Sequence, residues 1–345
     1  MNLRIGIVGL GANTRLRHVP GLRACAGVEI VGVANRRPES TRAAAEEYGI
    51  PKTYDRWEDL VADPQIDAVV IGTWPYLHAP VAIAALNAGK HVLTEARMAM
   101  DAAEAHRMLA AARARPDLTA RIVPSPFGLR GRQIVQQMLD QGFLGQCREA
   151  VVLGCNDAVA DPRAPLHWRQ RRELSGVNAL VLGILHETLI RWVPDPVSVL
   201  AQTAVFTPQR RDADSGQMAP VSTPDSVQVL SELPGGARAL YHLSGAIHFG
   251  PGMQMHLYGS EGTIKYLFTP EERLLAGRKG QSALSSVDLP DEATAGWRVE
   301  RDFVEAIGGA ASPNLPDFAL GVRYMEFTEA VARSAASGTA VRLPL

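Results

Sequence analysis

The chain has 345 residues, of which 46% are hydrophobic and 21% charged, and its 35 Lys and Arg residues against 36 Asp and Glu leave a formal net charge of −1. Such a balanced composition is typical of a globular protein and argues against a nucleic-acid or membrane-surface partner. The length is sufficient for two domains of ordinary size.

The three cysteines, Cys25, Cys147 and Cys155, are odd in number and lack C-x-x-C spacing. This pattern argues against a disulfide framework and a structural zinc site, and it fits a reducing compartment. The N-terminus has no basic start followed by a long apolar stretch, and every apolar run is only strand-sized. We therefore expect no signal peptide, no transmembrane helix, no metal and a cytoplasmic location.

The first predicted strand is the apolar run at residues 5–8, which ends in the Gly-x-Gly turn of Gly9 and Gly11. A helix follows from about Asn13, and we expect it to be interrupted at Pro20. This strand–turn–helix opening is typical of a dinucleotide-binding βαβ unit, in which the glycines let the backbone approach a pyrophosphate. Thr14 occupies the usual third small position. The predicted cofactor contacts in this turn are Gly9, Gly11, Ala12, Asn13 and Thr14.

Strands and helices then alternate up to about residue 123. The further predicted strands cover residues 28–33, 68–72, 91–93 and 120–123, and the further predicted helices cover residues 38–48, 57–62, 80–88 and 102–113. This alternation predicts an α/β domain with a parallel, doubly wound sheet, whose strands are apolar throughout because both faces are covered.

The texture changes after about Pro124. Helices are predicted at residues 132–141, 177–192 and 316–337, strands at 149–153, 197–206, 227–233, 238–244 and 254–258, and long loops at 207–225 and 276–296. The partly alternating strands indicate a sheet with antiparallel pairing. We predict a Rossmann domain over 1–123 and an α+β domain over 124–345, whose C-terminal helix, about 316–337, can pack back on the first domain.

The end of the second strand bears on the choice of cofactor. Instead of an acidic residue, which would accept from the ribose 2′-OH of NAD, the chain has Asn35, Arg36 and Arg37. Guanidinium groups suit a 2′-phosphate, so we predict NADP in preference to NAD. The alternative is that both arginines are solvated charges preceding Pro38.

Several segments resemble the glucose–fructose oxidoreductase / inositol dehydrogenase family (Gfo/Idh/MocA) over essentially the whole chain. Segment 17–20 (RHVP) follows the glycine turn, and segment 67–71 (DAVVI) precedes a turn with Pro75 and His78, similar to the family's Thr-Pro-Asn-x-x-His. Segment 88–95 (AGKHVLTE) resembles the approach to the Glu-Lys-Pro motif. Trp168–Arg169, His186 and segment 259–263 (GSEGT) resemble the family's Trp-Arg pair, site histidine and late turn.

The resemblance implies a Rossmann domain, a C-terminal domain with a large, mostly antiparallel sheet whose open face mediates dimer or tetramer contacts, and a nicotinamide between the domains. It assigns further cofactor contacts to Thr73, Trp74, Pro75, His78, Glu95, Ala96, Trp168 and Arg169. Two positions depart from the family pattern: Ala96 stands where the lysine is expected, and Leu182 stands where the aspartate is expected.

His186 and Arg97 are the predicted catalytic residues. Imidazole can exchange a hydroxyl proton near neutral pH, although a core histidine with a satisfied ring is the alternative for His186. Arg97 cannot act as a base, but it can polarise a carbonyl or hold a carboxylate; the alternative is a surface arginine. Trp74 and Tyr76 can stack on a nicotinamide or sugar ring or can simply pack.

These observations predict an NAD(P)-dependent oxidoreductase that transfers a hydride between nicotinamide and a sugar, polyol or related hydroxy/oxo compound. We expect a small carbohydrate-like substrate and a homodimer or homotetramer. Because Ala96 and Leu182 replace two ionisable residues, two alternatives stay open. One is a non-redox or elimination-type enzyme of the same fold, and the other is a catalytically silent NAD(P)-binding protein.

Overall fold

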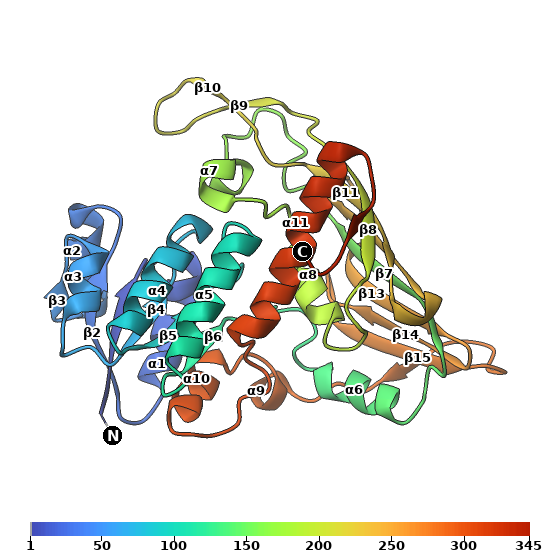
Figure 1. The fold of residues 1–345 in the computed structure, drawn as a ribbon, viewed down its shortest axis with the longest axis horizontal. Coiled ribbons are helices and arrows are strands. Elements are labelled where there is room, and N and C mark those ends of the chain that lie inside the picture. Colours follow the sequence, from blue (N-terminus) through green and yellow to red (C-terminus); the bar gives the residue numbers. More distant parts are fainter. Residues whose placement is uncertain (1) are drawn as a thin grey trace. The chain divides into compact units, whose positions relative to one another are not determined.

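The computed structural model describes residues 2–345, which divide into two compact units (Figure 1). The first unit combines the described residues up to Pro124 with Arg298–Val322, and the second combines Ser125–Trp297 with Arg323–Leu345. The sequence-based boundary between 123 and 124 is one residue from the observed one, and the main difference is that residues 298–322 belong to the first unit.

The first unit is built on a six-stranded sheet in the order β3-β2-β1-β4-β5-β6, in which every pairing is parallel. Its strands are β1 (Leu3–Val8), β2 (Val28–Ala34), β3 (Lys52–Thr53), β4 (Ala68–Ile71), β5 (His91–Thr94) and β6 (Ala120–Ile122). Strand β4 is fully apolar, and β1 is apolar except for Arg4, because helices cover both faces of the sheet. This order reverses direction between β1 and β4, which makes that pair the topological switch point.

Short, well-delimited helices connect these strands. They are α1 (Val19–Arg23), α2 (Pro38–Tyr48), α3 (Trp57–Ala62), α4 (His78–Asn87) and α5 (Ala102–Ala114), and α10 (Val299–Ile307) joins them from the C-terminal part of the chain. The interruption expected at Pro20 is wrong: a π-helical segment, Thr14–His18, runs directly into α1. Pro20 lies in the first turn of α1, where the fixed φ of proline suits helical geometry.

The second unit contains a nine-stranded sheet in the order β16-β15-β14-β13-β7-β12-β11-β8-β17. All neighbours pair antiparallel except β7 and β12, which are parallel. The strands are β7 (Cys147–Cys155), β8 (Ser198–Ala204), β11 (Ser226–Glu232), β12 (Arg238–Ser244), β13 (Gly252–Gly259), β14 (Gly262–Leu267), β15 (Arg273–Arg278), β16 (Ser285–Val287) and β17 (Val341–Arg342). The large, mostly antiparallel sheet expected from the sequence is confirmed.

One face of this sheet carries the core of the second unit. Helix α8 (Leu182–Leu189) and the part of α11 (Phe318–Ser337) beyond Val322 contribute Leu182, Leu185, Phe327 and Val331 to a cluster with the inward side chains of the strands. The remaining helices of this unit are α6 (Arg132–Asp140), α7 (Arg172–Ser175) and α9 (Glu292–Ala295). The single helix expected over 177–192 is therefore wrong in extent, because within that range the chain is helical only at α8.

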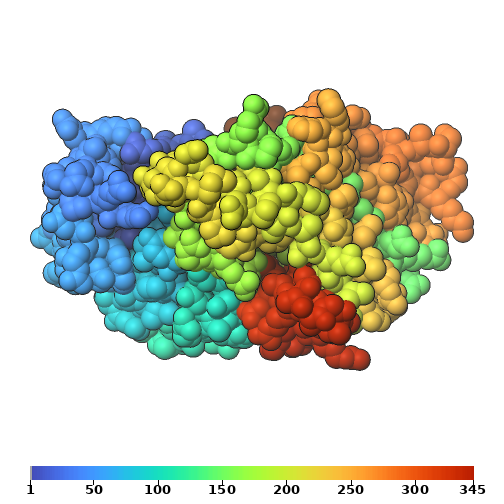
Figure 2. All heavy atoms as spheres, turned by 90° about the horizontal axis from the view of Figure 1, so that it is seen from above, coloured from blue at the N-terminus to red at the C-terminus, as the bar shows by residue number. Residues whose placement is uncertain are grey.

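The two stretches expected to be long loops contain regular structure. The first holds the hairpin of β9 (Gln209–Arg211) and β10 (Met218–Pro220), and the second holds β16 and α9. Figure 2 shows the hairpin, in yellow, on the surface of the second unit. Backbone Leu166 donates to the Arg211 carbonyl at 2.8 Å, so the hairpin is fastened to the segment that precedes α7.

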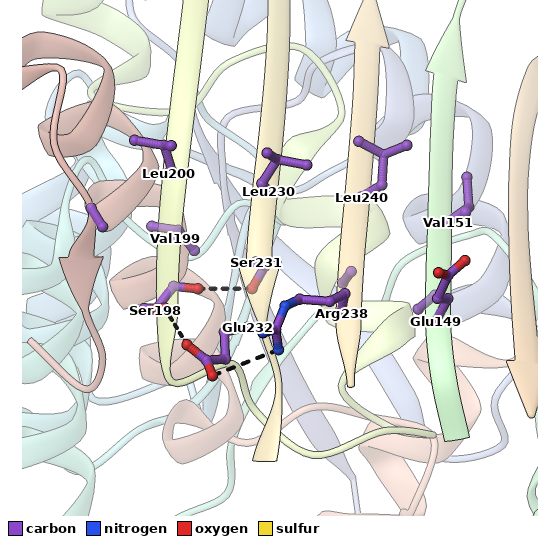
Figure 3. Close-up of a pocket in the computed structure, with 13 residues that line it drawn as sticks. Glu149, Val151, Ser198, Val199, Leu200, Leu230, Ser231, Glu232, Arg238 and Leu240 are labelled. Carbon is purple, nitrogen blue, oxygen red and sulfur yellow. Dashed lines mark hydrogen bonds and ion pairs between the residues drawn. The ribbon is translucent and has the colours of Figure 1, made fainter. Parts of the chain in front are cut away.

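The opposite face of the nine-stranded sheet is open and carries a row of aliphatic side chains (Figure 3). Leu200, Leu230, Leu240 and Val151 occupy the same register position on β8, β11, β12 and β7. Leu230 is 61% exposed, and the row borders a shallow pocket of about 410 Å³. Among residues 2–345, no helix is both long and apolar enough to cross a membrane.

Candidate dinucleotide site

A pocket of about 590 Å³ opens at the carboxyl ends of β1, β2 and β4 in the first unit. The sequence-predicted residues that line it are Gly9, Gly11, Asn35, Arg36, Thr73 and Trp74, joined by Arg15, Ser40, Asp55, Arg56, Trp57, Glu58, Tyr76 and Leu77 among others. Its size lies within the usual range for a small-molecule site, and it stands at the topological switch point of the sheet.

The glycine turn after β1 leaves room that only glycine permits. Gly9 has φ of +87°, and a Cβ there would lie 2.8 Å from the backbone nitrogen of Thr73. At Gly72, after β4, a Cβ would lie 2.3 Å from the Gly9 carbonyl oxygen and 2.0 Å from Thr14 Oγ1. The two turns therefore pack backbone against backbone, which explains why this pair of positions requires the smallest residue.

Among the described residues, the backbone N–H groups of Gly11, Ala12 and Asn13 make no hydrogen bond to a backbone carbonyl outside their own helical segment, and they stand at its first turn, where N–H groups have no intrahelical partner. All three residues are exposed at the start of the helical segment that leads into α1. Unpaired N–H groups at a helix start after a glycine turn are the donors that a dinucleotide pyrophosphate requires. The residues present at this turn therefore fit a bound dinucleotide.

The three predicted residues after β2, Asn35, Arg36 and Arg37, differ in their contacts and in whether they line the pocket. Asn35 Oδ1 accepts from the Leu10 N–H at 2.7 Å, and Asn35 Nδ2 donates to the Ser40 carbonyl at 3.0 Å, so this side chain ties the glycine turn to the start of α2. Arg36 is exposed and lines the pocket, whereas Arg37 is exposed but is not part of the lining.

The turn after β4 contributes the far wall of the pocket. Trp74 and Tyr76 line it, and the buried Oγ1 of Thr73 has no hydrogen-bond partner among the described residues. Pro75 is buried behind this wall. His78 is also buried, with Nδ1 2.8 Å from the Arg97 carbonyl and Nε2 3.0 Å from the Thr73 carbonyl. Burial lowers the pKa of His78, and a neutral ring can donate to only one of these two carbonyls.

Glu95 follows β5 and gathers polar side chains from two other segments. Its Oε1 accepts from Asn13 Nδ2 and lies 3.0 Å from His18 Nε2. His18 Nδ1 in turn lies 2.6 Å from Glu300 Oε1 on α10. Burial opposes a charge on His18, but the hydrogen bonds to Glu300 and Glu95 outweigh it and raise the pKa of His18 to about 9. Burial likewise opposes ionisation of Glu95, yet the hydrogen bond from His18 lowers the pKa of Glu95 overall.

The two residues after Glu95 are the predicted cofactor contact Ala96 and the predicted catalytic residue Arg97. Ala96 carries no ionisable side chain, and Arg97 is buried, at 7% exposure, with its carbonyl facing His78. The surface alternative for Arg97 is thereby wrong, while its assignment to substrate stays a prediction.

His186 lies on α8 in the second unit, inside the apolar core. Its ring stacks on Phe327 with centroids 3.5 Å apart, and its Nδ1 lies 2.8 Å from the Tyr241 hydroxyl. Nε2 is buried without a partner among the described residues, and burial lowers the pKa of His186 well below the usual value. These are the surroundings of a core histidine, so the role in proton transfer stays a prediction without support from this geometry.

Trp168 and Arg169 also belong to the second unit, in a short 3₁₀ turn, Trp168–Gln170. The Arg169 guanidinium stacks 4.2 Å over the Trp168 ring, and Thr223 Oγ1 donates to the Arg169 carbonyl at 2.9 Å. The turn is therefore well supported within its own unit, and its predicted contact with cofactor stays a prediction.

Sequence reasoning missed Glu300, Arg15, Arg56 and Trp57. Glu300 is 282 residues from its partner His18, so no local pattern links them. Arg56 and Trp57 follow the two-residue strand β3, which is too short to give a periodic signal. Arg15 lies three residues beyond Ala12 in the predicted phosphate turn, so its nearness to that turn was the available clue.

A parallel doubly wound sheet with a glycine-lined pocket at its switch point defines a dinucleotide-binding protein of the Rossmann type. Residues 3–121 match the oxidoreductase family with an NAD-binding Rossmann fold, and residues 133–265 match the GFO/IDH/MocA C-terminal domain. The chain therefore belongs to the GFO/IDH/MocA family, and it is an NAD(P)-dependent oxidoreductase.

Individual relatives agree with this placement. The chain is 30% identical to trans-1,2-dihydrobenzene-1,2-diol dehydrogenase of Mus musculus over 288 residues, covering 81% of this chain and 79% of the relative. It is 23% identical to levoglucosan dehydrogenase of Pseudarthrobacter phenanthrenivorans over 353 residues, covering 90% and 89%. A solved levoglucosan dehydrogenase complexed with NADH and L-sorbose has a similar fold, with a TM-score of 0.87, 24% identity and coverage of 100% and 99%.

Proposed function

We propose that this protein transfers a hydride between NADP and a small carbohydrate-like compound, a sugar or polyol or the corresponding oxo compound. The observation that carries the cofactor preference is the end of β2, where neutral Asn35 and exposed Arg36 border the pocket in place of a carboxylate. A carboxylate there would repel a 2′-phosphate, whereas a guanidinium offers it several donors.

The residues that would hold the cofactor in the first unit are the glycine turn with its free N–H groups, Arg36, Trp74 and Glu95. The bound nicotinamide would accept or supply the hydride. The buried Arg97 would polarise a carbonyl or hold a carboxylate of the substrate. His186 stays the predicted proton-transfer residue, and Trp168 and Arg169 stay predicted cofactor contacts. The relatives named for levoglucosan and for a dihydrodiol support a substrate with adjacent hydroxyl groups.

The cofactor preference is tested by measuring the Kd of both reduced cofactors by fluorescence. Arg36→Ala should weaken NADPH binding about tenfold or more and leave NADH binding nearly unchanged, because it removes one charge-assisted contact. Arg37→Ala is the matched control, since Arg37 is equally charged and exposed but does not line the pocket. Tighter binding of NADH, unaffected by either change, would refute the preference. Absorbance near 340 nm with NADP⁺ and a panel of sugars and polyols then tests the reaction.

We also propose that two copies of the chain associate through the open sheet face and that the enzyme works in the cytoplasm. The aliphatic row of Leu200, Leu230, Leu240 and Val151 gives an apolar centre. Glu149, Glu232 and Arg238 lie beside it (Figure 3), so carboxylates and a guanidinium are available for pairing between two copies of the same face. Self-complementarity of this kind is what a two-fold interface requires.

A further inference from the structure

A histidine without any exposed side-chain surface lies between two carboxylates in the first unit. His18 Nδ1 is 2.6 Å from Glu300 Oε1, and Nε2 is 3.0 Å from Glu95 Oε1. Carboxylate oxygens only accept, so both contacts are hydrogen bonds only if both ring nitrogens carry protons. His18 is therefore an imidazolium, and its positive charge lies between two negative ones.

The two oxygens of Glu95 are in different situations. Oε1 accepts from both Asn13 and His18, whereas Oε2 makes no hydrogen bond to the residues that the structure describes. The side chain keeps 15% exposure, so this second oxygen is not sealed from solvent. One oxygen is thus held in place, and the other has no hydrogen-bond partner among the described residues.

Glu95, His18 and Glu300 form an ionic triad. Its Glu300 end is closely packed. Glu300 is 3% exposed, and a Cβ at Gly21 on α1 would lie 2.5 Å from Glu300 Oε2. The glycine therefore lets α10 bring its carboxylate against His18. A buried ionic triad adds little net stability compared with apolar residues of the same volume, because all three groups must be desolvated. Stability alone does not account for its presence.

The position of Glu95 in the sheet relates the triad to the cofactor site. Glu95 directly follows β5, which belongs to the β4-β5-β6 half of the sheet. In a doubly wound sheet of this order the two halves each take one mononucleotide, so the half that does not receive the adenosine receives the nicotinamide. The charged and titratable groups that face Glu95 are His18 and, farther off, His78, and those that face His18 are Glu95 and Glu300.

We propose that His18 and Glu300 are positioning residues that hold Glu95 as an oriented carboxylate in the nicotinamide half of the site, where its charge favours the oxidised, positively charged form of the cofactor. This inference rests on the proposed function. Ala96 carries no charge beside Glu95. The cation that pairs with Glu95 is the His18 ring, which contacts Oε1 and leaves Oε2 without a hydrogen-bond partner among the described residues.

The first experiment measures the Kd of the oxidised and the reduced cofactor for the full chain by calorimetry and fluorescence. Glu95→Gln keeps the shape and removes the charge, and it should shift the ratio of the two constants toward the reduced form by about tenfold or more, because the oxidised nicotinamide loses the attraction of a partly buried negative charge. The matched control is His91→Gln, because His91 starts β5 at the opposite end of the strand, where its Nδ1 accepts from the Thr119 N–H at 2.9 Å.

The second experiment tests whether His18 and Glu300 keep Glu95 ionised. In the wild type Glu95 is ionised throughout pH 6–8, so the ratio should be constant. In His18→Gln the buried Glu95 loses its cation, its pKa rises, and the preference for the oxidised form should fall as the pH is lowered from 8 to 6. Glu300→Gln should lower the midpoint of the His18 imidazole titration, followed by NMR in the cofactor-free protein, below the value of about 9.

The outcomes separate the two proposals. A wild-type protein that binds neither form of either cofactor refutes the proposed function and this inference together. Normal binding with an unchanged ratio in Glu95→Gln, or a wild-type-like, pH-independent ratio in His18→Gln, overturns the inference alone. A wild-type His18 midpoint near 6.5 would overturn it as well, because the ring would then be neutral at physiological pH.

Discussion

Replacement of His186 decides between a core residue and a proton-transfer residue. The ring is 1% exposed, stacks on Phe327 at 3.5 Å and contacts the Tyr241 hydroxyl at 2.8 Å. His186→Ala would leave a cavity of aromatic size and an unpaired hydroxyl, so we expect a loss of about 3–5 kcal/mol in unfolding free energy. Tyr241→Phe removes only the hydroxyl and should cost about 1–2 kcal/mol.

The assay pairs urea unfolding, followed by tryptophan fluorescence, with turnover measured in the absence of denaturant. For His186→Leu, which fills part of the space, we expect a lowered unfolding midpoint and a kcat within about tenfold of the wild type. A general acid or base would instead contribute about 10²–10⁴-fold to the rate. An unchanged midpoint with a kcat reduced more than about a hundredfold would refute the core interpretation and support the sequence-based role.

Three further outcomes follow from the structure. The pKa of His18 is raised from 6.5 to about 9 on folding, so protonation of His18 adds roughly 3 kcal/mol of pH-dependent unfolding free energy, which is fully present below pH 6.5, is lost as the pH rises through 9 and is separate from the desolvation cost of the triad; urea unfolding at pH 7 and pH 10 should reveal this loss in the wild type and not in His18→Gln. Gly72→Ala would place a Cβ 2.0 Å from Thr14 Oγ1, so the glycine turn must shift and NADPH binding should weaken about tenfold or more; wild-type affinity by fluorescence titration would contradict this. Leu230→Arg puts a charge on each side of the proposed two-fold interface, so size-exclusion chromatography with light scattering should detect a smaller assembly, and an unchanged mass would exclude this sheet face as the interface.

Elements with strong local signals could be predicted with their ends. Helix α2 begins and ends where expected because Pro38 suits the first helical turn and Gly49 adopts φ of +58°, the left-handed conformation that closes a helix. The first strand and the Gly-x-Gly turn were equally predictable, since an apolar run followed by Gly-x-Gly and a helical segment is typical of the first βαβ unit of a dinucleotide-binding domain. The candidate pocket was predictable to the same degree, because its glycines, Asn35, Arg36 and Thr73 all follow predicted strands.

Other elements depend on contacts between distant residues. The apolar run over 177–192 reads as one helix, yet Leu180 has φ of +47° and the helix α8 starts only at Leu182. Both the helical and the irregular part are rich in buried or half-buried apolar side chains, so apolar content alone could not separate them. Strands β14 to β16 and helix α10 were missed because their short, mixed sequences acquire regular structure only by pairing or packing with neighbours.

The first unit's site combines charges of opposite sign at its two ends, and neither end could be assigned in full from local sequence. At the end of β2, Asn35 is occupied by backbone contacts, which leaves Arg36 as the group that faces the pocket. At the end of β5, Glu95 is held by a histidine and by a carboxylate that comes from α10. A dinucleotide with a phosphorylated adenosine ribose and an oxidised nicotinamide carries negative charge at one end and positive charge at the other. The two ends should therefore respond differently: salt should weaken the exposed Arg36 contact, while the buried triad should be sensitive to pH and nearly insensitive to salt.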